Sequence, residues 1–278
     1  MNGRHLTGRE GAAVDAQGAF RLPRFRGYAL DLDGTVYLGD RLLPGAGAVV
    51  RELRERGARV VFVTNKPLES AGDYARKLGA LGIEAERADV VTALDSLLHY
   101  LRERHAGARI LTVAEPLVDR ELERAGFAVT RDAGEADVVA VSFDRTFDYA
   151  KLTRAFHAVR GGAALVATNP DPFCPTGDGD LPDCAAMLAA IEASAGVRAE
   201  AIAGKPSAHM ARALVNRLGV AAGESVVVGD RLGTDVAMAA ALGMSSVLVL
   251  SGATSTEEAA RSDVTPDFVV DDVRALLG

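Results

Sequence analysis

Residues 28–40 read YALDLDGTVYLGD, and this stretch decides the fold. Its apolar start predicts a buried strand. Two carboxylates, Asp31 and Asp33, follow where that strand ends, and a Gly-Thr pair comes directly after them. Because like charges that lie close together repel each other, folding alone does not favour this arrangement. The stretch therefore predicts a strand whose carboxyl end carries a chemical site.

The composition limits the class of protein. The chain has 278 residues, which suggests two domains at roughly 150 residues per domain. The net charge of -7 argues against a nucleic-acid partner. No apolar run approaches the roughly 18 residues of a membrane helix, and the N-terminus lacks the apolar region of a secretory signal. Cys174 and Cys184 do not form a disulfide framework, so we expect a reducing cytoplasm.

Apolar runs rich in Val and Ile alternate with helix-like segments along the chain. Strands are predicted over residues 59–65, 108–115, 137–144, 163–171, 225–230 and 245–252. Helices are predicted over residues 44–56, 68–81, 149–160, 185–195 and 208–218. Strands that are buried on both faces and alternate with helices favour parallel sheets covered by helices. The predicted fold class is α/β.

Several predicted strands end in polar residues, and a lysine stands ahead of a predicted helix. Ligands of open parallel sheets bind beyond the carboxyl ends of the strands, so we expect these side chains to converge. They are Asp31, Asp33, Thr64, Asn65, Lys205, Asp230 and Asp235.

Each of these residue types suits phosphoryl chemistry. Clustered carboxylates repel unless a hard cation lies among them, and Mg²⁺ prefers oxygen ligands. One carboxylate can attack phosphorus and form an aspartyl-phosphate, while a second acid protonates the leaving oxygen and later activates water. Thr64, Lys205 and the backbone N–H groups of the Gly34–Thr35 turn could bind the negative charge of the phosphoryl group.

Four motifs, DLDGT, VTN, GKP and GDRLGTD, in this order resemble the haloacid dehalogenase (HAD) superfamily of phosphohydrolases. The segments DGTVYLGD, FVTNK, VSFDRTFDYAKL and ATNPDPFCP are similar to the branch that includes NagD-type, 4-nitrophenyl, phosphoglycolate and pyridoxal phosphate phosphatases. The resemblance covers the chain from about Phe25 to its C-terminus.

The resemblance implies roles for the four acids. Asp31 would be the nucleophile, and Asp33 the general acid/base. The metal would be Mg²⁺, bound by Asp31, Asp230 and the backbone carbonyl of Asp33. Asp235 would be a further metal-binding acid or would support Lys205. The expected reaction is hydrolysis of a small-molecule phosphate monoester through an aspartyl-phosphate.

The resemblance also assigns the phosphate-binding residues and the domains. Thr64 and Lys205 would hold the phosphoryl group, with Asn65 beside it. About 140 residues separate Thr64 from Lys205, far more than a connection within a compact domain needs. The resemblance implies that a large α/β cap is inserted there, between the second and third motifs of a Rossmann-like core. The expected parts are a flexible extension over 1–20, core over 21–88, cap over 89–198 and core again over 199–278.

Three cap residues, Asn169, Asp171 and Asp183, are candidates for selecting the substrate. Asn169 and Asp171 also fit an Asx-type turn ahead of Pro172. Relatives usually carry a Gly-rich segment of PGAGA type where this chain has PDCAA at 182–186, which adds an acid. A carboxylate near the pocket would disfavour a second negative charge on the substrate, so we expect a neutral sugar or polyol monophosphate.

Other readings stay open. A phosphotransferase or mutase would use the same Asp31 chemistry, although the known mutases carry their cap just after the DxD motif. A phosphoglycolate, pyridoxal phosphate or nucleotide phosphatase is a further alternative. A signalling receiver domain also surrounds an acceptor Asp with acids, Thr and Lys, but is a single small domain. Many relatives dimerise through the cap, so a homodimer is among the expectations.

Overall fold

The chain forms two compact units in a computed structural model that describes residues 7–8, 13–14, 20–174 and 179–278. The core unit comprises residues 1–63, 75–91 and 211–278. The inserted unit comprises residues 64–74 and 92–210. Each unit has a sheet of mainly parallel strands with helices, which confirms the predicted α/β class. The cap boundaries expected at 89 and 198 stay a prediction.

A seven-stranded sheet forms the centre of the core unit, in the order β1-β18-β17-β16-β4-β7-β8. Neighbouring strands from β18 to β7 are parallel, whereas β1 is antiparallel to β18. The strands are β1 (Thr7–Gly8), β4 (Gly27–Asp31), β7 (Arg59–Thr64), β8 (Val90–Thr92), β16 (Ser225–Gly229), β17 (Ser245–Val249) and β18 (Phe268–Val270). Apart from β1 and the two-residue β2 (Ala13–Val14), nearly all of the extension expected over 1–20 lies outside the described residues.

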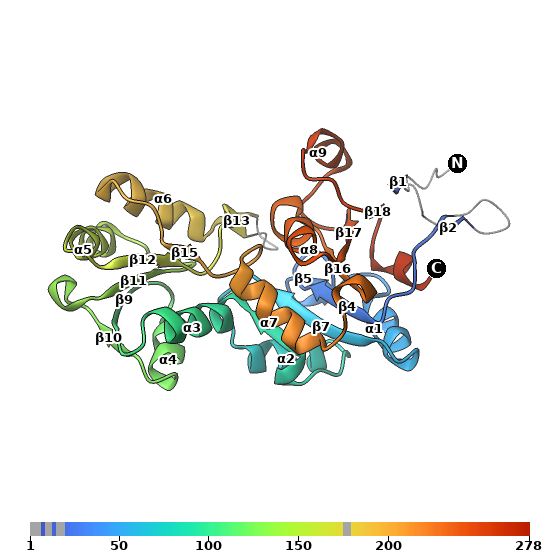
Figure 1. Cartoon of the computed structure of the whole chain (residues 1–278), viewed down its shortest axis with the longest axis horizontal. Helices are drawn as coiled ribbons and strands as arrows, with labels where there is room; N and C mark the ends of the chain where they lie inside the picture. Colours follow the sequence, from blue (N-terminus) through green and yellow to red (C-terminus); the bar gives the residue numbers. More distant parts are fainter. Residues whose placement is uncertain (1–6, 9–12, 15–19, 175–178) are drawn as a thin grey trace. The chain divides into compact units, whose positions relative to one another are not determined.

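The order of the core strands reverses between β4 and β16. The chain proceeds from β4 outward to β7 and β8, and later from β16 outward to β17 and β18 on the other side. Such a reversal opens a crevice at the carboxyl ends of the two central strands, where ligands of open α/β sheets bind. Figure 1 shows β4 and β16 side by side in the middle of this sheet.

The remaining core elements connect these strands. The helices are α1 (Ala46–Glu55), α2 (Ala71–Ala80), α7 (Ala208–Leu218), α8 (Ala237–Leu242) and α9 (Thr256–Arg261). A five-residue π-helical turn, η4 (Leu232–Val236), leads into α8, and short 3₁₀ turns are η1 (Arg87–Asp89), η3 (Ala222–Glu224) and η5 (Val273–Leu277). Short antiparallel pairs join β2 to β3 (Phe20–Arg21) and β5 (Tyr37–Leu38) to β6 (Arg41–Leu42).

The inserted unit has its own five-stranded parallel sheet, in the order β10-β9-β11-β12-β15. Its strands are β9 (Arg109–Val113), β10 (Ala128–Thr130), β11 (Val138–Val141), β12 (Ala164–Ala167) and β15 (Ala201–Ile202). Its helices are α3 (Ala93–Arg104), α4 (Pro116–Arg124), α5 (Tyr149–Arg160) and α6 (Cys184–Ala195). A 3₁₀ turn, η2 (Ala133–Glu135), and a small hairpin of β13 (Phe173–Cys174) and β14 (Leu181–Pro182) complete it.

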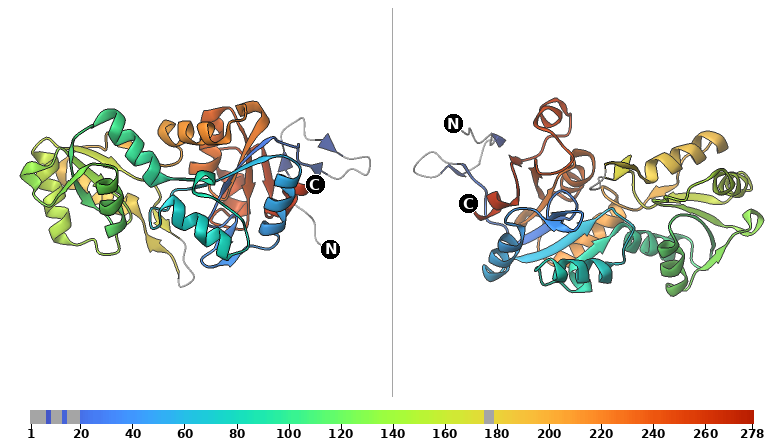
Figure 2. Two further views of the ribbon diagram at one scale, coloured as in Figure 1. Left: turned by 90° about the horizontal axis from the view of Figure 1, so that it is seen from below. Right: turned by 180° about the vertical axis from the view of Figure 1, so that it is seen from behind.

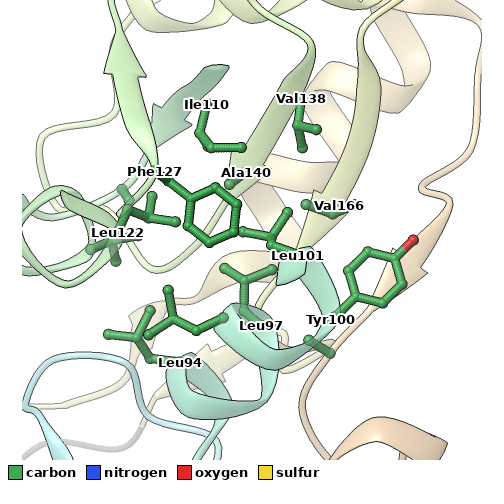
Figure 3. Close-up of a cluster of buried hydrophobic side chains, with 14 of the residues drawn as sticks. Leu94, Leu97, Tyr100, Leu101, Ile110, Leu122, Phe127, Val138, Ala140 and Val166 are labelled. Atoms are coloured by element: carbon green, nitrogen blue, oxygen red, sulfur yellow. The ribbon is translucent and has the colours of Figure 1, made fainter. Parts of the chain in front are cut away.

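Helices cover both faces of the inserted sheet. In Figures 1 and 2, α5 and α6 lie on one face and α3 and α4 on the other. The side chains of β11 alternate accordingly: Val138 and Ala140 belong to one buried cluster, and Val139 and Val141 to the other. Figure 3 shows the first cluster, in which Leu97 and Leu101 of α3 pack against Phe127 and strand side chains. This two-sided burial explains the continuous apolar runs in the sequence.

The structure confirms most predicted elements, with boundaries moved by a few residues. Predicted helices at 149–160 and 208–218 match α5 and α7, and each predicted strand is present but shorter at its carboxyl end. Helices α3, α4, α8 and α9 carry no matching prediction from the sequence, nor do the short sheet strands β8, β10, β15 and β18. None of the helices in the described ranges combines the length and apolar character needed to cross a bilayer.

Candidate active site

The first acid, Asp31, is the last residue of β4, and its side chain is buried. The turn that follows is closed on itself. The carbonyl oxygen of Leu32 accepts hydrogen bonds from the N–H groups of residues 35, 36 and 37, and Gly34 N–H donates to the carbonyl of Tyr37 at 2.8 Å. Gly34 has a φ of 86°, which favours glycine. This turn fixes the backbone beside Asp31.

That turn corrects one expectation. The backbone N–H groups of Gly34 and Thr35 were candidate donors to phosphate oxygens. Both N–H groups instead donate to carbonyl oxygens of the same turn, Gly34 to Tyr37 and Thr35 to Leu32. Their hydrogens are used to hold the loop, because a tight turn leaves few backbone donors unpaired.

Two further acids come from the end of β16. Asp230 follows β16 directly, is 1% exposed, and accepts a hydrogen bond from Ala253 N–H at 2.6 Å. Asp235 lies in the π-helical turn η4, is also 1% exposed, and accepts from Arg231 N–H at 3.2 Å. The π-helical turn places Asp235 on the same side as Asp230, and such turns are frequent at functional sites.

Glycines make room for these carboxylates. A Cβ atom added to Gly34 or Gly252 would lie 2.4 Å or 2.1 Å from Oδ2 of Asp230. A Cβ atom added to Gly229 would lie 2.2 Å from the carboxyl carbon of Asp235. Backbone and carboxylate can approach this closely only where no side chain intervenes. Gly252 was not predicted as a site residue, although its place directly after an apolar strand is a usable signal.

Asp31, Asp230 and Asp235 form a cluster that fits a divalent cation. One carboxylate oxygen from each lies within 4.8 Å of the others, and all three residues are buried. Three close negative charges repel, and an all-oxygen donor set matches a hard cation such as Mg²⁺ or Ca²⁺. The carboxylate of Asp33 is not part of this cluster, and Asp33 is only half-buried. We call the three residues the acid cluster.

The second group of predicted site residues belongs to the inserted unit. Thr64 is the last residue of β7, one position beyond Val63, whose backbone is paired with Asp31. Its buried hydroxyl accepts a hydrogen bond from Lys66 N–H at 3.1 Å. Lys205 is 2% exposed, which is rare for a lysine and indicates a specific role for its charge.

The side chain of Asn65 makes hydrogen bonds within the inserted unit, and its predicted place beside the phosphate stays a prediction. Its Oδ1 accepts from Lys205 N–H at 2.7 Å, and its Nδ2 donates to the Lys205 carbonyl at 3.2 Å and to Asp171 Oδ2 at 2.8 Å. An amide group has two donor hydrogens, and both are used here. Asn65 therefore positions Lys205 and has no side-chain donor left for a phosphate group. Gly204 permits this contact, since a Cβ there would lie 2.5 Å from Asn65 Oδ1.

The three predicted cap residues form one buried hydrogen-bond network. Nδ2 of Asn169 donates to Asp171 Oδ2 at 2.9 Å and to Asp183 Oδ1 at 3.3 Å. Asp183 is also the N-cap of α6, where its Oδ1 accepts from Cys184 N–H at 2.5 Å. The structure thus gives the acid of the PDCAA segment a role in starting a helix. Burial raises the pKa of the adjacent Cys184 thiol to about 12, so it stays protonated.

Comparison with known proteins defines the class of this protein. A family model described as haloacid dehalogenase-like hydrolase matches residues 28–128, and a second HAD hydrolase-like model matches residues 202–276. The chain is 36% identical to the sugar-phosphatase AraL of Bacillus subtilis over 248 residues, which cover 89% of this chain and 90% of that protein. The chain therefore belongs to the haloacid dehalogenase-like hydrolases.

Solved structures place it more narrowly. A 4-nitrophenylphosphatase from Thermotoga maritima matches with a TM-score of 0.84 and 36% identity, over 91% of this chain and 96% of that one. A glycerol phosphate phosphatase from Mycobacterium tuberculosis in complex with magnesium matches with a TM-score of 0.83 and 35% identity, over 91% and 76%. NagD itself is among the matches. This chain is a NagD-like phosphatase, a hydrolase of small phosphate monoesters.

Proposed function

We propose that this phosphatase is Mg²⁺-dependent and acts on neutral sugar or polyol monophosphates. The observation that supports it is the acid cluster, in which Asp31, Asp230 and Asp235 meet at the point where the strand order reverses. A bound Mg²⁺ would neutralise these carboxylates and the phosphate oxygens. The names of two relatives, a sugar phosphatase and a glycerol phosphate phosphatase, support the substrate class.

We infer the following division of work among the chain's own residues. Asp31 attacks phosphorus and forms an acyl phosphate, while Asp33 gives a proton to the leaving oxygen. Asp33 then accepts a proton from the water that hydrolyses the intermediate. Thr64 and Lys205 bind the phosphoryl oxygens, and Asn65 holds Lys205 in position. Asp230 and Asp235 would hold the cation together with Asp31.

The charge of Asp183 does not support the substrate preference. Its carboxylate caps α6 and accepts from Asn169, so its charge is already balanced by hydrogen bonds from N–H groups. We infer the neutral leaving group from the relatives alone. We infer a cytoplasmic location from the two unbridged cysteines, and a homodimer from the resemblance to the family.

The test is phosphate release by the purified chain from a panel of monoesters. The panel contains glycerol phosphates, sugar phosphates, phosphoglycolate, pyridoxal phosphate, a nucleotide and p-nitrophenyl phosphate, each with Mg²⁺ and with EDTA. We expect the highest kcat/KM for a glycerol or sugar phosphate, and loss of turnover by roughly 10³-fold or more in Asp31→Asn. A kcat/KM for phosphoglycolate equal to that for glycerol phosphate would contradict the substrate class.

The same assay separates hydrolysis from transfer. A phosphotransferase would phosphorylate Asp31 but pass the group to a sugar, so it would release little inorganic phosphate without an acceptor. We expect release at the same rate with and without added sugar. An increase in phosphorylated sugar at the expense of inorganic phosphate would favour the transferase alternative.

A further inference from the structure

The inserted unit contains a polar cavity that is lined by residues other than those assigned above. Its volume is about 130 Å³, roughly ten times the 10–15 Å³ that one water molecule requires. The polar residues that line it are Thr112, Asp119, Arg131, Thr146, Lys151 and Arg154. We call this cavity the basic pocket, because three of these side chains are cationic and one is acidic.

The position of the basic pocket in the fold is that of a ligand site. The inserted sheet reverses its strand order at β9, because the chain proceeds from β9 to β10 on one side and then to β11 on the other. Thr112 lies near the end of β9, and Thr146 follows β11. The crevice beyond the carboxyl ends of two such strands is where open α/β sheets bind ligands.

Two helices begin beside this pocket. Pro116, a lining residue, is the first residue of α4, and Lys151 lies in the first turn of α5. The N-terminal end of a helix carries a partial positive charge, which adds to the charge of the three cationic side chains. The pocket is therefore electropositive from both its backbone and its side chains.

Hydrogen bonds hold two of the cations in fixed positions. Arg131 donates to Thr112 Oγ1 at 2.8 Å and also to Asp119, and Thr112 donates to Asp119 Oδ1 at 2.5 Å. On the other side, Lys151 Nζ donates to Thr146 Oγ1 at 2.6 Å and to the buried Asp144. An ammonium group has three donors, so this lysine keeps one for a ligand.

The positive charge of Arg154, the third cation of the basic pocket, is not paired by any of these contacts. Arg154 lies three residues after Lys151 on α5, and therefore on the same face of the helix. Within the described part of the chain it makes no hydrogen bond and no ion pair. Arg154 is half-buried, and its guanidinium offers five N–H donors in a planar fork, a geometry that matches the oxygens of a phosphate group.

We propose that the basic pocket binds a phosphate group, either as inorganic phosphate or as the phosphate end of a small metabolite. Arg154 and Lys151 supply the unused donors, and Arg131 supplies further positive charge from the opposite wall. The site is built entirely by the inserted unit, and it needs neither the acid cluster nor a metal ion.

The test uses the full chain in EDTA, so that no turnover occurs. Binding of radiolabelled inorganic phosphate is measured by equilibrium dialysis, with chloride at matched ionic strength as the reference. The variants are Arg154→Gln and Arg131→Gln. Arg160→Gln is the control, because it removes the same charge from an exposed position on the same helix. We expect the wild type and Arg160→Gln to bind phosphate alike, and Arg154→Gln to bind at least about tenfold more weakly.

Competition with unlabelled glycerol 3-phosphate distinguishes the two sources of phosphate. If glycerol 3-phosphate displaces the label at a lower concentration than unlabelled phosphate does, the site is assigned to a phosphorylated metabolite. If unlabelled phosphate displaces it at the lower concentration, the site is assigned to free phosphate. Equal binding by the wild type, Arg154→Gln and Arg131→Gln would overturn the proposal, as would binding that is lost only in Lys205→Met. Because the assay requires no metal and no turnover, its outcome is independent of the function proposed above.

Discussion

The side chain of Asn65 holds the backbone of Lys205 from two directions. Oδ1 of Asn65 accepts from Lys205 N–H at 2.7 Å, and Nδ2 donates to the Lys205 carbonyl at 3.2 Å. These residues are separated by 140 positions in the sequence. The amide thus connects the second motif to the third and fixes the segment from which the lysine side chain extends.

Replacing Asn65 by Ala should therefore destabilise the protein and slow the reaction. The change removes the hydrogen bonds that Asn65 makes to the Lys205 backbone and one of those that Asp171 accepts, which we expect to cost about 3 kcal/mol in the free energy of unfolding. Denaturant unfolding and kcat measure the two effects. Asn216→Ala, at an exposed position of α7, should change the unfolding free energy by less than about 0.5 kcal/mol. Equal stability of the two variants would show that the Asn65 contacts do not hold this segment.

Alanine substitutions at two glycines with positive φ distinguish the cost of backbone strain from the cost of a steric clash with the acid cluster. Gly34 and Gly39 have φ values of 86° and 58°, but only the added Cβ at Gly34 would meet Asp230, at 2.4 Å. We expect Gly39→Ala to cost about 1 kcal/mol through strain alone. Gly34→Ala should cost clearly more and should also lower kcat, because Asp230 must move. Thermal unfolding and steady-state kinetics measure this, and similar costs for both variants would mean that the cluster tolerates the methyl group.

The acid cluster predicts stabilisation by divalent cations. A cation that binds only the folded protein stabilises it by about 2.7 kcal/mol at a concentration one hundred times its Kd. Addition of Mg²⁺ should therefore raise the thermal midpoint of the wild type. Asp235→Asn should lose most of this rise, because one of three charged ligands is gone. Asp40→Asn, which changes a highly exposed acid, should keep it. A full Mg²⁺ response in Asp235→Asn would remove that residue from the metal site.

The start of α6 should depend on Asp183. Its side chain caps the helix and accepts from Asn169, so Asp183→Ala should cost about 1–2 kcal/mol. Asp183→Ser retains a capping oxygen and should recover part of that loss. Chemical unfolding of the two variants tests this. An Asp183→Ala variant that is as stable as the wild type would contradict the capping role. If its relative kcat/KM for substrates with a second negative charge also rises, the Asp183 carboxylate repels such substrates, as the sequence indicated.

Tyr100 predicts a specific alkaline pH dependence of stability. Burial and the hydrogen bond to Glu200 raise the pKa of its phenol from 10.0 to about 12. Because the folded state holds this proton more tightly than the unfolded chain, the interaction stabilises the protein below pH 10 and is lost as the pH rises from 10 to about 12. The wild type should lose stability over this window more steeply than Tyr100→Phe.

The control for that titration is Tyr149→Phe, because Tyr149 is 83% exposed. The unfolding free energy of Tyr149→Phe should match that of the wild type at every pH. At neutral pH, Tyr100→Phe should be less stable by about 1 kcal/mol, the usual net value of one hydrogen bond. If the unfolding free energies of the wild type and Tyr100→Phe fall in parallel between pH 10 and 12, the raised pKa of Tyr100 is contradicted.

The elements that the sequence predicted are those with a local signal. Apolar runs such as 225–230 and 245–252 appear as β16 and β17, and α7 has its predicted bounds. The two-residue β15 and the three-residue β10 were not predicted, because they carry too little local pattern and exist through their pairing with β12 and β9. Their position is a property of the sheet and not of their own residues.

The candidate site likewise has features that the sequence predicts and features that depend on the tertiary structure. By itself the sequence determined the α/β class and the chemical identity of the site, because ordered motifs fix which acids, hydroxyl and lysine are present. Only the tertiary structure decided what surrounds these residues. The amide of Asn65 is hydrogen-bonded to the Lys205 backbone, Asp183 caps the start of α6, and Gly252 lies against Asp230. These contacts join residues far apart in the chain, and a side chain has too few hydrogen-bonding groups to serve every role that its motif allows.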